Sequence, residues 1–473
     1  MLSRRHLLQT SACGFGSLAF NALASSSGGQ PLAAQKTHHP ARAKRVIFLF
    51  MAGGVSHVDS FDHKPKLYEE DGRMIDFDDA RTVAKTGMGA AQRVMKPLWE
   101  FKQRGESGHQ ASDLFPHMAS MVDDLTFVHS MHTEGVAHGP ATIFLHTGST
   151  SFVRPSMGSW ISYGLGTEND NLPGFVSLSP SMGNGGPRNY GTAFLPPVFQ
   201  GTALGRAGLP ASNANIRNIK NSLLTPAQQH KQFDLLRGIN QAQLQRAGMT
   251  PDPEVEAVIN SYELAWRLQN HAPEAFDISK ESPETLALYG IGDGLPSDNY
   301  GRQCLMARRL AEQGVRYIQV NYSDNSNNPA WDQHSNMPKH AEHAAAVDRP
   351  VWALVQDLKQ RGLLEDTIVW WGGEFGRTPY SERNGTGRDH NPGGFTVWLA
   401  GGGFKPGYAH GATDEFGHMA VEDKVHMHDL HATILHQLGL NHERLTYRHA
   451  GRDFRLTDVH GHVVKDLFAR THA

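Results

Sequence analysis

The chain has 473 residues, of which 39% are hydrophobic and 19% are charged, a composition that supports a buried core and argues against general disorder. The formal net charge of -3 argues against a nucleic-acid binder, because such proteins carry a basic excess on one face. The 28 histidines are unusually many. Since histidine is the commonest metal ligand, they favour a metal site without locating it.

The N-terminus predicts export. Arg4 and Arg5 precede a mildly apolar run rich in Gly and Ala, which ends at Ala22-Leu23-Ala24. Paired arginines before a short apolar segment and a small-residue cleavage site are typical of a twin-arginine signal peptide. We therefore expect residues 1–24 to be a signal and the mature protein to be periplasmic or extracellular. The apolar run is too short, and too interrupted by Gly and Ser, for a stable membrane span.

The remaining chain reads as a linker followed by one folded domain. Residues 25–43 are rich in Ser, Gly, Gln and His, which is typical of a linker, and we expect the domain to occupy residues 44–473. Short, continuous apolar runs, which predict strands buried on both faces, begin at Val46, Leu125, Val315, Thr367 and Phe395.

Helical patterns separate several of these strands. Residues 301–313 and 341–361 place apolar positions at helical spacing, and each pattern leads through a glycine toward a strand. This alternation predicts an α/β fold with a mostly parallel sheet sandwiched by helices. Residues 180–300 differ, because a stretch rich in Gly, Pro and Asn is followed by a helical one. We expect them to form an insertion or cap outside the sheet.

Candidate metal ligands lie where these strands begin or end. In a parallel sheet, ligands bind beyond the carboxyl ends of the strands. In chain order the candidates are Asp59, Asp332, His334, Glu374, Asp389 and His390. Carboxylates mixed with imidazoles suit a divalent ion, and the pattern leaves Zn, Ca, Mg and Mn open. For any single candidate a turn, a cap or a surface ion pair is the simpler interpretation, whereas several acting together favour a metal site.

Three segments carry a resemblance to the alkaline phosphatase and sulfatase superfamily. They are Asp366–Gly376, Asp389–Pro392, and Asp429–Leu435 followed by Gly439. Together with the paired arginines and the W-D-x-H sequence that ends at His334, they resemble an exported domain-of-unknown-function family with sulfatase-like character. The resemblance extends from Arg45 to about Phe454. It implies the superfamily fold and a metal-dependent site.

The same resemblance shows where the chain departs from sulfatases. Pro140, Thr147 and Gly148 keep the register of the sulfatase segment that carries the nucleophilic cysteine, and His138 falls on that cysteine. Formylglycine chemistry is thereby excluded at this position. The resemblance leaves His138 as a further ligand, a general acid or a covalent nucleophile. The Asp-Asp pair that follows the first sulfatase strand is replaced here by Ala52-Gly53.

Two arginines complete the predicted site. Arg377 and Arg388 lie close in sequence to the candidate ligands, and a guanidinium can hold an anionic ester oxygen in a bidentate fork. An ordinary structural role is an equally good interpretation of each.

Two functions follow as hypotheses. The first is an exported metal-dependent hydrolase of sulfate or phosphate esters, with an anionic ester such as a sulfated polysaccharide as substrate and water activated by the metal. The second is a non-catalytic binding or structural homologue that keeps the fold and a metal. The missing cysteine and the missing Asp-Asp pair favour the second hypothesis, so the sequence leaves catalysis open.

Overall fold

The computed structural model describes residues 33–77, 91–214, 223–247, 276–292, 294–382 and 386–469. The signal peptide expected over residues 1–24 lies outside these ranges. Within them, no helix combines the length and apolarity that a membrane crossing requires.

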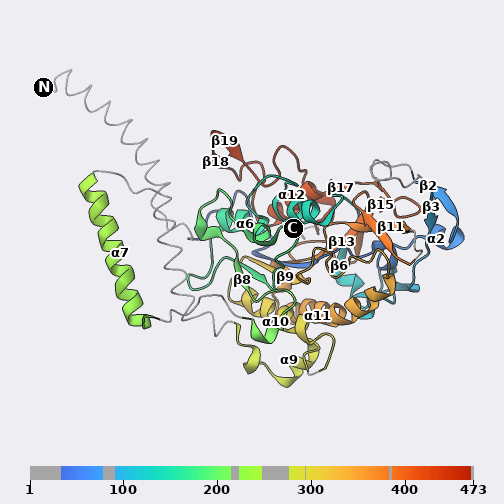
Figure 1. Ribbon diagram of the computed structural model, residues 1–473, viewed down its shortest axis with the longest axis horizontal. Helices are drawn as coiled ribbons and strands as arrows, with labels where there is room; N and C mark the ends of the chain where they lie inside the picture. The colour runs from blue at the N-terminus through green and yellow to red at the C-terminus, as the bar shows by residue number, and fades with distance from the viewer. Residues whose placement is uncertain are drawn as a thin grey trace, which may run out of the picture.

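A mixed sheet, with nine strands in the described part of the chain, forms the centre of the fold (Figure 1). Its order is β14 (Tyr408–His410), β6 (Leu125–His132), β13 (Phe395–Ala400), β10 (Thr367–Gly372), β1 (Arg45–Met51), β9 (Tyr317–Tyr322), β7 (Phe175–Leu178) and β8 (Thr202–Leu204), and β17 (Val425–His426) also pairs with β6. Strands were predicted near the start of β1, β6, β9, β10 and β13, and all five lie in this sheet, which confirms the predicted α/β class.

Most neighbouring strands are parallel, and β13 is the exception. It runs antiparallel to both β10 and β6, whereas β1 is parallel to both β10 and β9. A continuous apolar run indicates a strand buried on both faces, but it carries no information about the strand's direction. The sequence therefore predicted the position of β13 and not its orientation.

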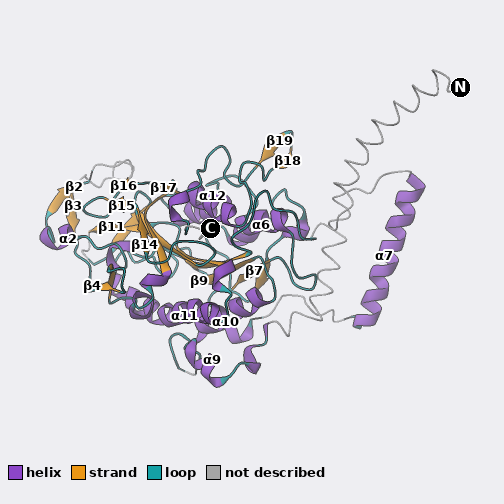
Figure 2. Cartoon of the chain, turned by 180° about the vertical axis from the view of Figure 1, so that it is seen from behind, coloured by secondary structure: helices purple, strands orange, loops and turns teal. Residues whose placement is uncertain are grey.

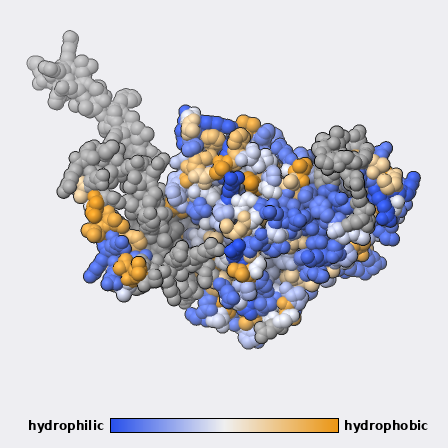
Figure 3. Space-filling view, viewed as in Figure 1, coloured by the Kyte–Doolittle hydropathy of each residue, from blue (hydrophilic) through white to orange (hydrophobic). Residues whose placement is uncertain are grey.

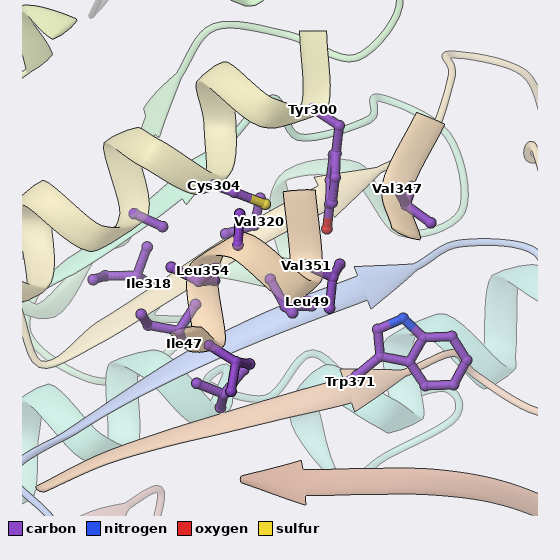
Figure 4. Packing of buried hydrophobic residues seen from close by; sticks show 14 of the residues in the cluster. Ile47, Leu49, Tyr300, Cys304, Ile318, Val320, Val347, Val351, Leu354 and Trp371 are labelled. Carbon is purple, nitrogen blue, oxygen red and sulfur yellow. The ribbon is translucent and has the colours of Figure 1, made fainter. Parts of the chain in front are cut away.

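The sheet is buried on both faces because its central strands are apolar throughout. In β1, Ile47, Leu49 and Met51 point into one hydrophobic cluster. The alternate residues Val46 and Phe48 belong to the cluster on the other face. Successive side chains of a strand point to opposite faces, so a single strand contributes to both cores. Figure 4 shows the first cluster, in which Ile47 and Leu49 lie beneath Cys304 and Leu354.

Helices cover each face, and Figure 2 shows the two layers on either side of the sheet. The first cluster is covered by α4 (Pro116–Ala119), α10 (Asp298–Glu312) and α11 (His340–Gln360). The second is covered by α5 (His138–Thr147), α6 (Met157–Leu165) and α12 (Met427–Gln437). The helices predicted over residues 301–313 and 341–361 are α10 and α11, and both are confirmed.

A smaller antiparallel sheet lies beside the carboxyl end of β10. Its order is β12 (Arg388–Asn391), β11 (Gly376–Ser381), β3 (Ala91–Val94) and β2 (Met74–Asp76). The other described helices and strands are α2 (Pro65–Glu69), β4 (Phe101–Arg104), β5 (His109–Ser112), α7 (Pro226–Ala247), α9 (Pro283–Leu288), β15 (Ala412–Thr413), β16 (Ala420–Glu422), β18 (Tyr447–His449) and β19 (Arg452–Phe454).

One segment predicted to lie outside the sheet, residues 180–300, contributes a strand to it. β8 pairs in parallel with β7, so residues 180–300 contribute an edge strand rather than lying wholly outside the sheet. A three-residue strand in a glycine-rich stretch carries no readable pattern. The predicted helix after Thr225 is α7, on which Leu235 and Ile239 are exposed. Figure 3 shows hydrophobic patches on the surface of the molecule. The described end of the linker is bonded to the domain, since Gln35 donates its N–H to Leu165 and Arg42 to Gln437.

Candidate metal centre

Three segments distant in sequence meet at the carboxyl ends of the central strands. His138 is the first residue of α5, as predicted for a side chain facing the site from a helix start. Asp332 and His334 lie in the loop between β9 and α11, and His390 lies in β12. The sheet thus brings together three of the predicted metal ligands and the predicted catalytic histidine.

The ligand atoms of these four residues converge on a small volume. Oδ1 of Asp332 lies 3.1 Å from Nε2 of His138 and 2.9 Å from Nε2 of His334. The same oxygen lies 3.2 Å from Nε2 of His390, and the Nε2 atoms of His334 and His390 are 3.0 Å apart. All four ligand atoms lie within 4.8 Å of one another. We call these four residues the histidine cluster.

Each imidazole of the histidine cluster is oriented by an acceptor at its other nitrogen. Nδ1 of His138 donates to Glu374 over 2.6 Å, and Nδ1 of His334 donates to Glu382 over 3.0 Å. Nδ1 of His390 donates to the carbonyl oxygen of Val136 over 2.9 Å. A carboxylate or carbonyl oxygen only accepts, so each Nδ1 carries the proton. In the neutral ring Nε2 is then a lone pair, and three such lone pairs point at one volume.

This arrangement leaves lone pairs that protein atoms do not satisfy. Nε2 of His138 is buried and faces Oδ1 of Asp332 at 3.1 Å, an acceptor that offers no proton to an unprotonated nitrogen. Two unprotonated Nε2 atoms 3.0 Å apart, on His334 and His390, cannot hydrogen-bond to each other. Ligands about 2.0–2.1 Å from a tetrahedral zinc ion lie about 3.3–3.4 Å from each other, close to the distances found here. The residues present therefore fit a divalent cation.

Electrostatics prepare Asp332 to act as an anionic ligand. Burial alone would raise the pKa of Asp332, but in the absence of a cation the imidazoles that carry a proton on Nε2 donate to Asp332, and these hydrogen bonds and the guanidinium of Arg377 hold that pKa well below its ordinary value. A bound cation would take the place of those protons. Burial lowers the pKa of His390 to about 3, which keeps its ring neutral. Burial also lowers the pKa of His138, but contacts with Asp332 and Glu374 outweigh it and leave that pKa raised.

Glu374 supports the histidine cluster instead of joining it. Its carboxylate accepts two hydrogen bonds from the N–H of Gly53, at 3.0 and 3.1 Å, and is fully buried. It contacts Nδ1 of His138, the ring edge away from the cluster. Such a carboxylate fixes the tautomer of a ligand histidine and raises its basicity. Glu374, predicted as a direct ligand, thus lies outside the group of ligand atoms that converge in this structure.

Arg377 and Arg388 are structural rather than open to a substrate. Both are fully buried. Arg377 donates Nη2 to Oδ1 of Asp332 over 2.8 Å and Nε to the carbonyl oxygen of Gly54 over 3.0 Å. Arg388 donates Nε to Asp59 over 2.7 Å, and its other nitrogens donate to backbone carbonyls. The prediction that these guanidiniums hold an ester oxygen is therefore not supported.

The remaining predicted ligands, Asp59 and Asp389, lie outside the histidine cluster. Asp59 is fully buried and pairs with Arg388, and it also accepts the N–H of Leu98 over 3.0 Å. Oδ1 of Asp389 lies 3.8 Å from Nδ1 of His334, on the same side as Glu382. Sequence reasoning missed Glu382, because no motif marks a glutamate that follows β11. Glu382 and Asp389 surround His334 on the side away from Asp332.

A glycine allows the Asp332 loop to approach the end of β1. Gly53 has a φ of +112°, and a Cβ placed there would lie 2.7 Å from the backbone nitrogen of Asp332. Only glycine tolerates both the conformation and the contact. This approach accounts for the glycine at position 53, because the backbone of the Asp332 loop occupies the space that a side chain there would need.

Several solved structures are similar to this chain at low sequence identity. The crystal structure of PsFucS1 sulfatase from Pseudoalteromonas sp. is 12% identical, with a TM-score of 0.36 over 85% of this chain and 69% of that one. A protein in the alkaline phosphatase superfamily from Vibrio parahaemolyticus is 8% identical, with a TM-score of 0.36 over 87% of this chain and 70% of that one. Ps i-CgsB in complex with k-i-k-neocarrahexaose is 12% identical, with a TM-score of 0.37 over 84% of this chain and 72% of that one.

No curated protein matches the chain. The family profile described as "Protein of unknown function (DUF1501)" matches residues 43–468. This match spans both sheets and all four residues of the histidine cluster. The chain therefore belongs to the DUF1501 family.

Proposed function

We propose that the histidine cluster holds one divalent transition-metal ion and that the protein uses it to hydrolyse sulfate or phosphate esters. The observation that carries the proposal is the convergence of three imidazole Nε2 atoms on Oδ1 of Asp332. Three imidazoles with one carboxylate suit zinc or iron, whereas calcium and magnesium prefer oxygen ligands throughout. Of the metals that the sequence left open, this ligand set favours zinc over calcium and magnesium.

The residues of the chain position the ion, provide the negative charge that binds it and leave one side open to the substrate. A bound ion would supply Lewis-acid activation of water or of an ester oxygen, with no need for a protein nucleophile. Asp332 and its partner Arg377 hold the centre of the cluster from the buried side. The side chain of His334 is 37% exposed and marks the side from which an ester reaches the cluster. Because Nε2 of His138 points into the cluster, a ligand role suits it better than acid or nucleophilic catalysis.

One observation favours the second candidate, a non-catalytic metal-binding protein. The four side chains of the histidine cluster are enough to complete a tetrahedral shell. Structural zinc sites are closed in this way, whereas catalytic zinc sites keep one position for water or substrate. Turnover requires that the ion in this cluster accept a fifth ligand.

Removal of the metal separates the two candidates. We expect the purified protein to hydrolyse 4-nitrophenyl sulfate or 4-nitrophenyl phosphate, to lose that activity after dialysis against 1,10-phenanthroline, and to regain it when zinc is restored. Release of 4-nitrophenol measures each step. Turnover that survives complete metal removal would contradict the hydrolase proposal. Zinc binding without turnover of either ester would favour the non-catalytic candidate.

Export and a sulfated polysaccharide substrate belong to the same proposal and rest on the sequence. Arg4 and Arg5 form the pair that a twin-arginine translocon would read. With both arginines replaced by lysine, we expect the precursor to stay in the cytoplasm, as immunoblots of cell fractions would show. Unchanged export of this double variant would refute the signal assignment.

A further inference from the structure

We propose that His334 is an exchangeable ligand of the histidine cluster, which gives up its position to an oxygen of the ester while the other three ligands stay in place. This inference rests on the proposed function and names the residue through which the metal centre admits its substrate. Four protein ligands complete a closed shell, whereas a catalytic site has three and keeps one position for water or substrate. The burial and the hydrogen-bond partners of the four side chains divide them into three fixed ligands and one exchangeable ligand.

Burial distinguishes His334 from the other three ligands. The side chains of Asp332, His138 and His390 are 4%, 6% and 12% exposed, whereas that of His334 is 37% exposed. An oxygen that arrives from solvent can replace only a ligand that solvent reaches. The exposed imidazole of His334 is therefore the one that a substrate can displace, and it lies on the side from which the substrate would enter.

The ring of Phe375 holds His390 and His138 in place. Phe375 is 1% exposed, and its ring stacks on that of His390 with the centroids 4.5 Å apart and the planes at 28°. The same ring lies 5.0 Å from that of His138, centroid to centroid. A Cβ on Gly54 would lie 2.8 Å from Cδ2 of Phe375, so the ring has no room to shift toward that glycine. Because buried side chains are closely packed, neither imidazole can rotate away from the cluster without displacing this ring.

The carboxylate partner of His138 is buried, whereas that of His334 is partly exposed. Glu374, which accepts from Nδ1 of His138, is fully buried and is held by the N–H of Gly53. Glu382, which accepts from Nδ1 of His334, is 26% exposed. Water competes for a hydrogen bond between partly exposed groups, so such a bond contributes less than a buried one. His334 is therefore less firmly held than His138.

His334 can leave the cluster by a rotation of its side chain alone. Its backbone is fixed, because the N–H of Arg388 donates to the neighbouring carbonyl oxygen of Gln333 over 3.1 Å. Its Nδ1 lies 3.0 Å from Glu382 and 3.8 Å from Asp389, so two carboxylates can accept this N–H as the ring turns. In the exchange the coordinate bond from Nε2 breaks, a coordinate bond from an ester oxygen forms, and the proton on Nδ1 stays where it is. Glu382 thereby acts as a positioning residue for the displaced imidazole.

The zinc affinities of two matched variants of the full-length protein test this division. His334→Ala and His390→Ala each remove one imidazole of the histidine cluster. We expect His390→Ala to weaken zinc binding by more than about 100-fold and His334→Ala by about tenfold or less, because water can take the exposed position. Competition with a chromophoric chelator measures both affinities, and equal losses would overturn the inference. If thermal unfolding shows that His390→Ala does not fold, His138→Ala takes its place.

Binding of inorganic phosphate to the cobalt-loaded protein gives a readout that a purely structural role would not change. Cobalt(II) occupies mixed imidazole and carboxylate sites as zinc does, and its visible absorption changes with its ligands. In the wild type phosphate must displace a tethered imidazole, whose effective concentration is on the order of millimolar. In His334→Ala phosphate displaces only water, so we expect it to bind about tenfold more tightly than to the wild type. At saturating phosphate the two spectra should coincide, because the same three protein ligands remain.

A surface histidine provides the control. His449 on β18 is exposed and lies outside the histidine cluster. His449→Ala should therefore match the wild type in both zinc affinity and phosphate affinity. Equal phosphate affinity in the wild type and His334→Ala would overturn the inference, because phosphate would then not compete with His334. The absence of phosphate binding to either cobalt-loaded protein would overturn it as well.

Failure of this inference is distinguishable from failure of the proposed function. Phosphate binding as expected, without turnover of either 4-nitrophenyl ester, would support the exchange of His334 and refute the hydrolase alone. Turnover with equal phosphate affinity in the wild type and His334→Ala would support the hydrolase and overturn the exchange. A wild type that binds neither zinc nor cobalt would refute the proposed metal centre, and the inference with it.

Discussion

Asp332→Asn is expected to abolish metal binding at the histidine cluster. Oδ1 of Asp332 is the one atom that all three Nε2 atoms approach within 3.2 Å. Asparagine keeps the shape but removes the anionic ligand and leaves Arg377 without its carboxylate partner. Loss of a supporting partner of a ligand costs roughly 10–100-fold in metal affinity, and loss of the ligand itself should cost more. Calorimetric titration with zinc measures the change.

A second carboxylate in the same loop gives the control. Asp324 lies at the start of the loop, where it accepts hydrogen bonds from Ser326, and it is not part of the histidine cluster. Asp324→Asn should retain wild-type zinc affinity. Zinc should raise the melting temperature of the wild type and of this control, but not that of Asp332→Asn, because a ligand stabilises only a protein that binds it. Equal zinc affinity in all three proteins would show that the ion binds elsewhere.

Asp59→Ala is expected to destabilise the fold while leaving zinc affinity unchanged. Asp59 and Arg388 are fully buried and paired at 2.7 Å. Removing one partner of a buried pair leaves an uncompensated charge and costs about 3–5 kcal/mol of unfolding free energy. Urea unfolding measures the stability of the variant. Loss of zinc binding by a folded Asp59→Ala protein would restore Asp59 to the ligand set that the sequence predicted.

The control for this variant is an ion pair at the surface. Lys102 and Asp113 lie 2.9 Å apart, and their side chains are 49% and 39% exposed. Asp113→Ala should change the unfolding free energy far less, because water solvates the charge that remains. A similar loss of unfolding free energy in both variants would mean that burial does not determine how much the Asp59–Arg388 pair stabilises the fold.

Local sequence signals were sufficient for the fold class. The apolar runs at Val46 and Thr367 predicted strands, because side chains buried on both faces leave no polar alternation. The direction of β13 and the edge strand β8 were not predictable. Direction depends on how the chain returns to the sheet, and a three-residue strand depends on its neighbours rather than on its own pattern.

Part of the site was predictable, because sheet topology determines which residues lie at one edge of the sheet. Asp332, His334 and His390 flank strands, so sheet topology alone brings them to one edge. The roles of Glu374 and Arg388 depend on burial and on partners distant in sequence. Glu374 meets the end of β1, and Arg388 meets Asp59. The sequence does not distinguish a charged residue that contacts the ion from one that hydrogen-bonds to a metal ligand on the side away from the ion.

X-ray diffraction at the zinc absorption edge, on crystals grown with one equivalent of zinc, tests the metal centre most directly. One anomalous peak is expected, about 2.0–2.1 Å from Nε2 of His138, His334 and His390, and at a similar distance from Oδ1 of Asp332. Glu374 should contact His138 and not the ion. A peak at the carboxylates of Glu382 and Asp389, or no peak within reach of the three imidazoles, would contradict the histidine cluster as the metal site.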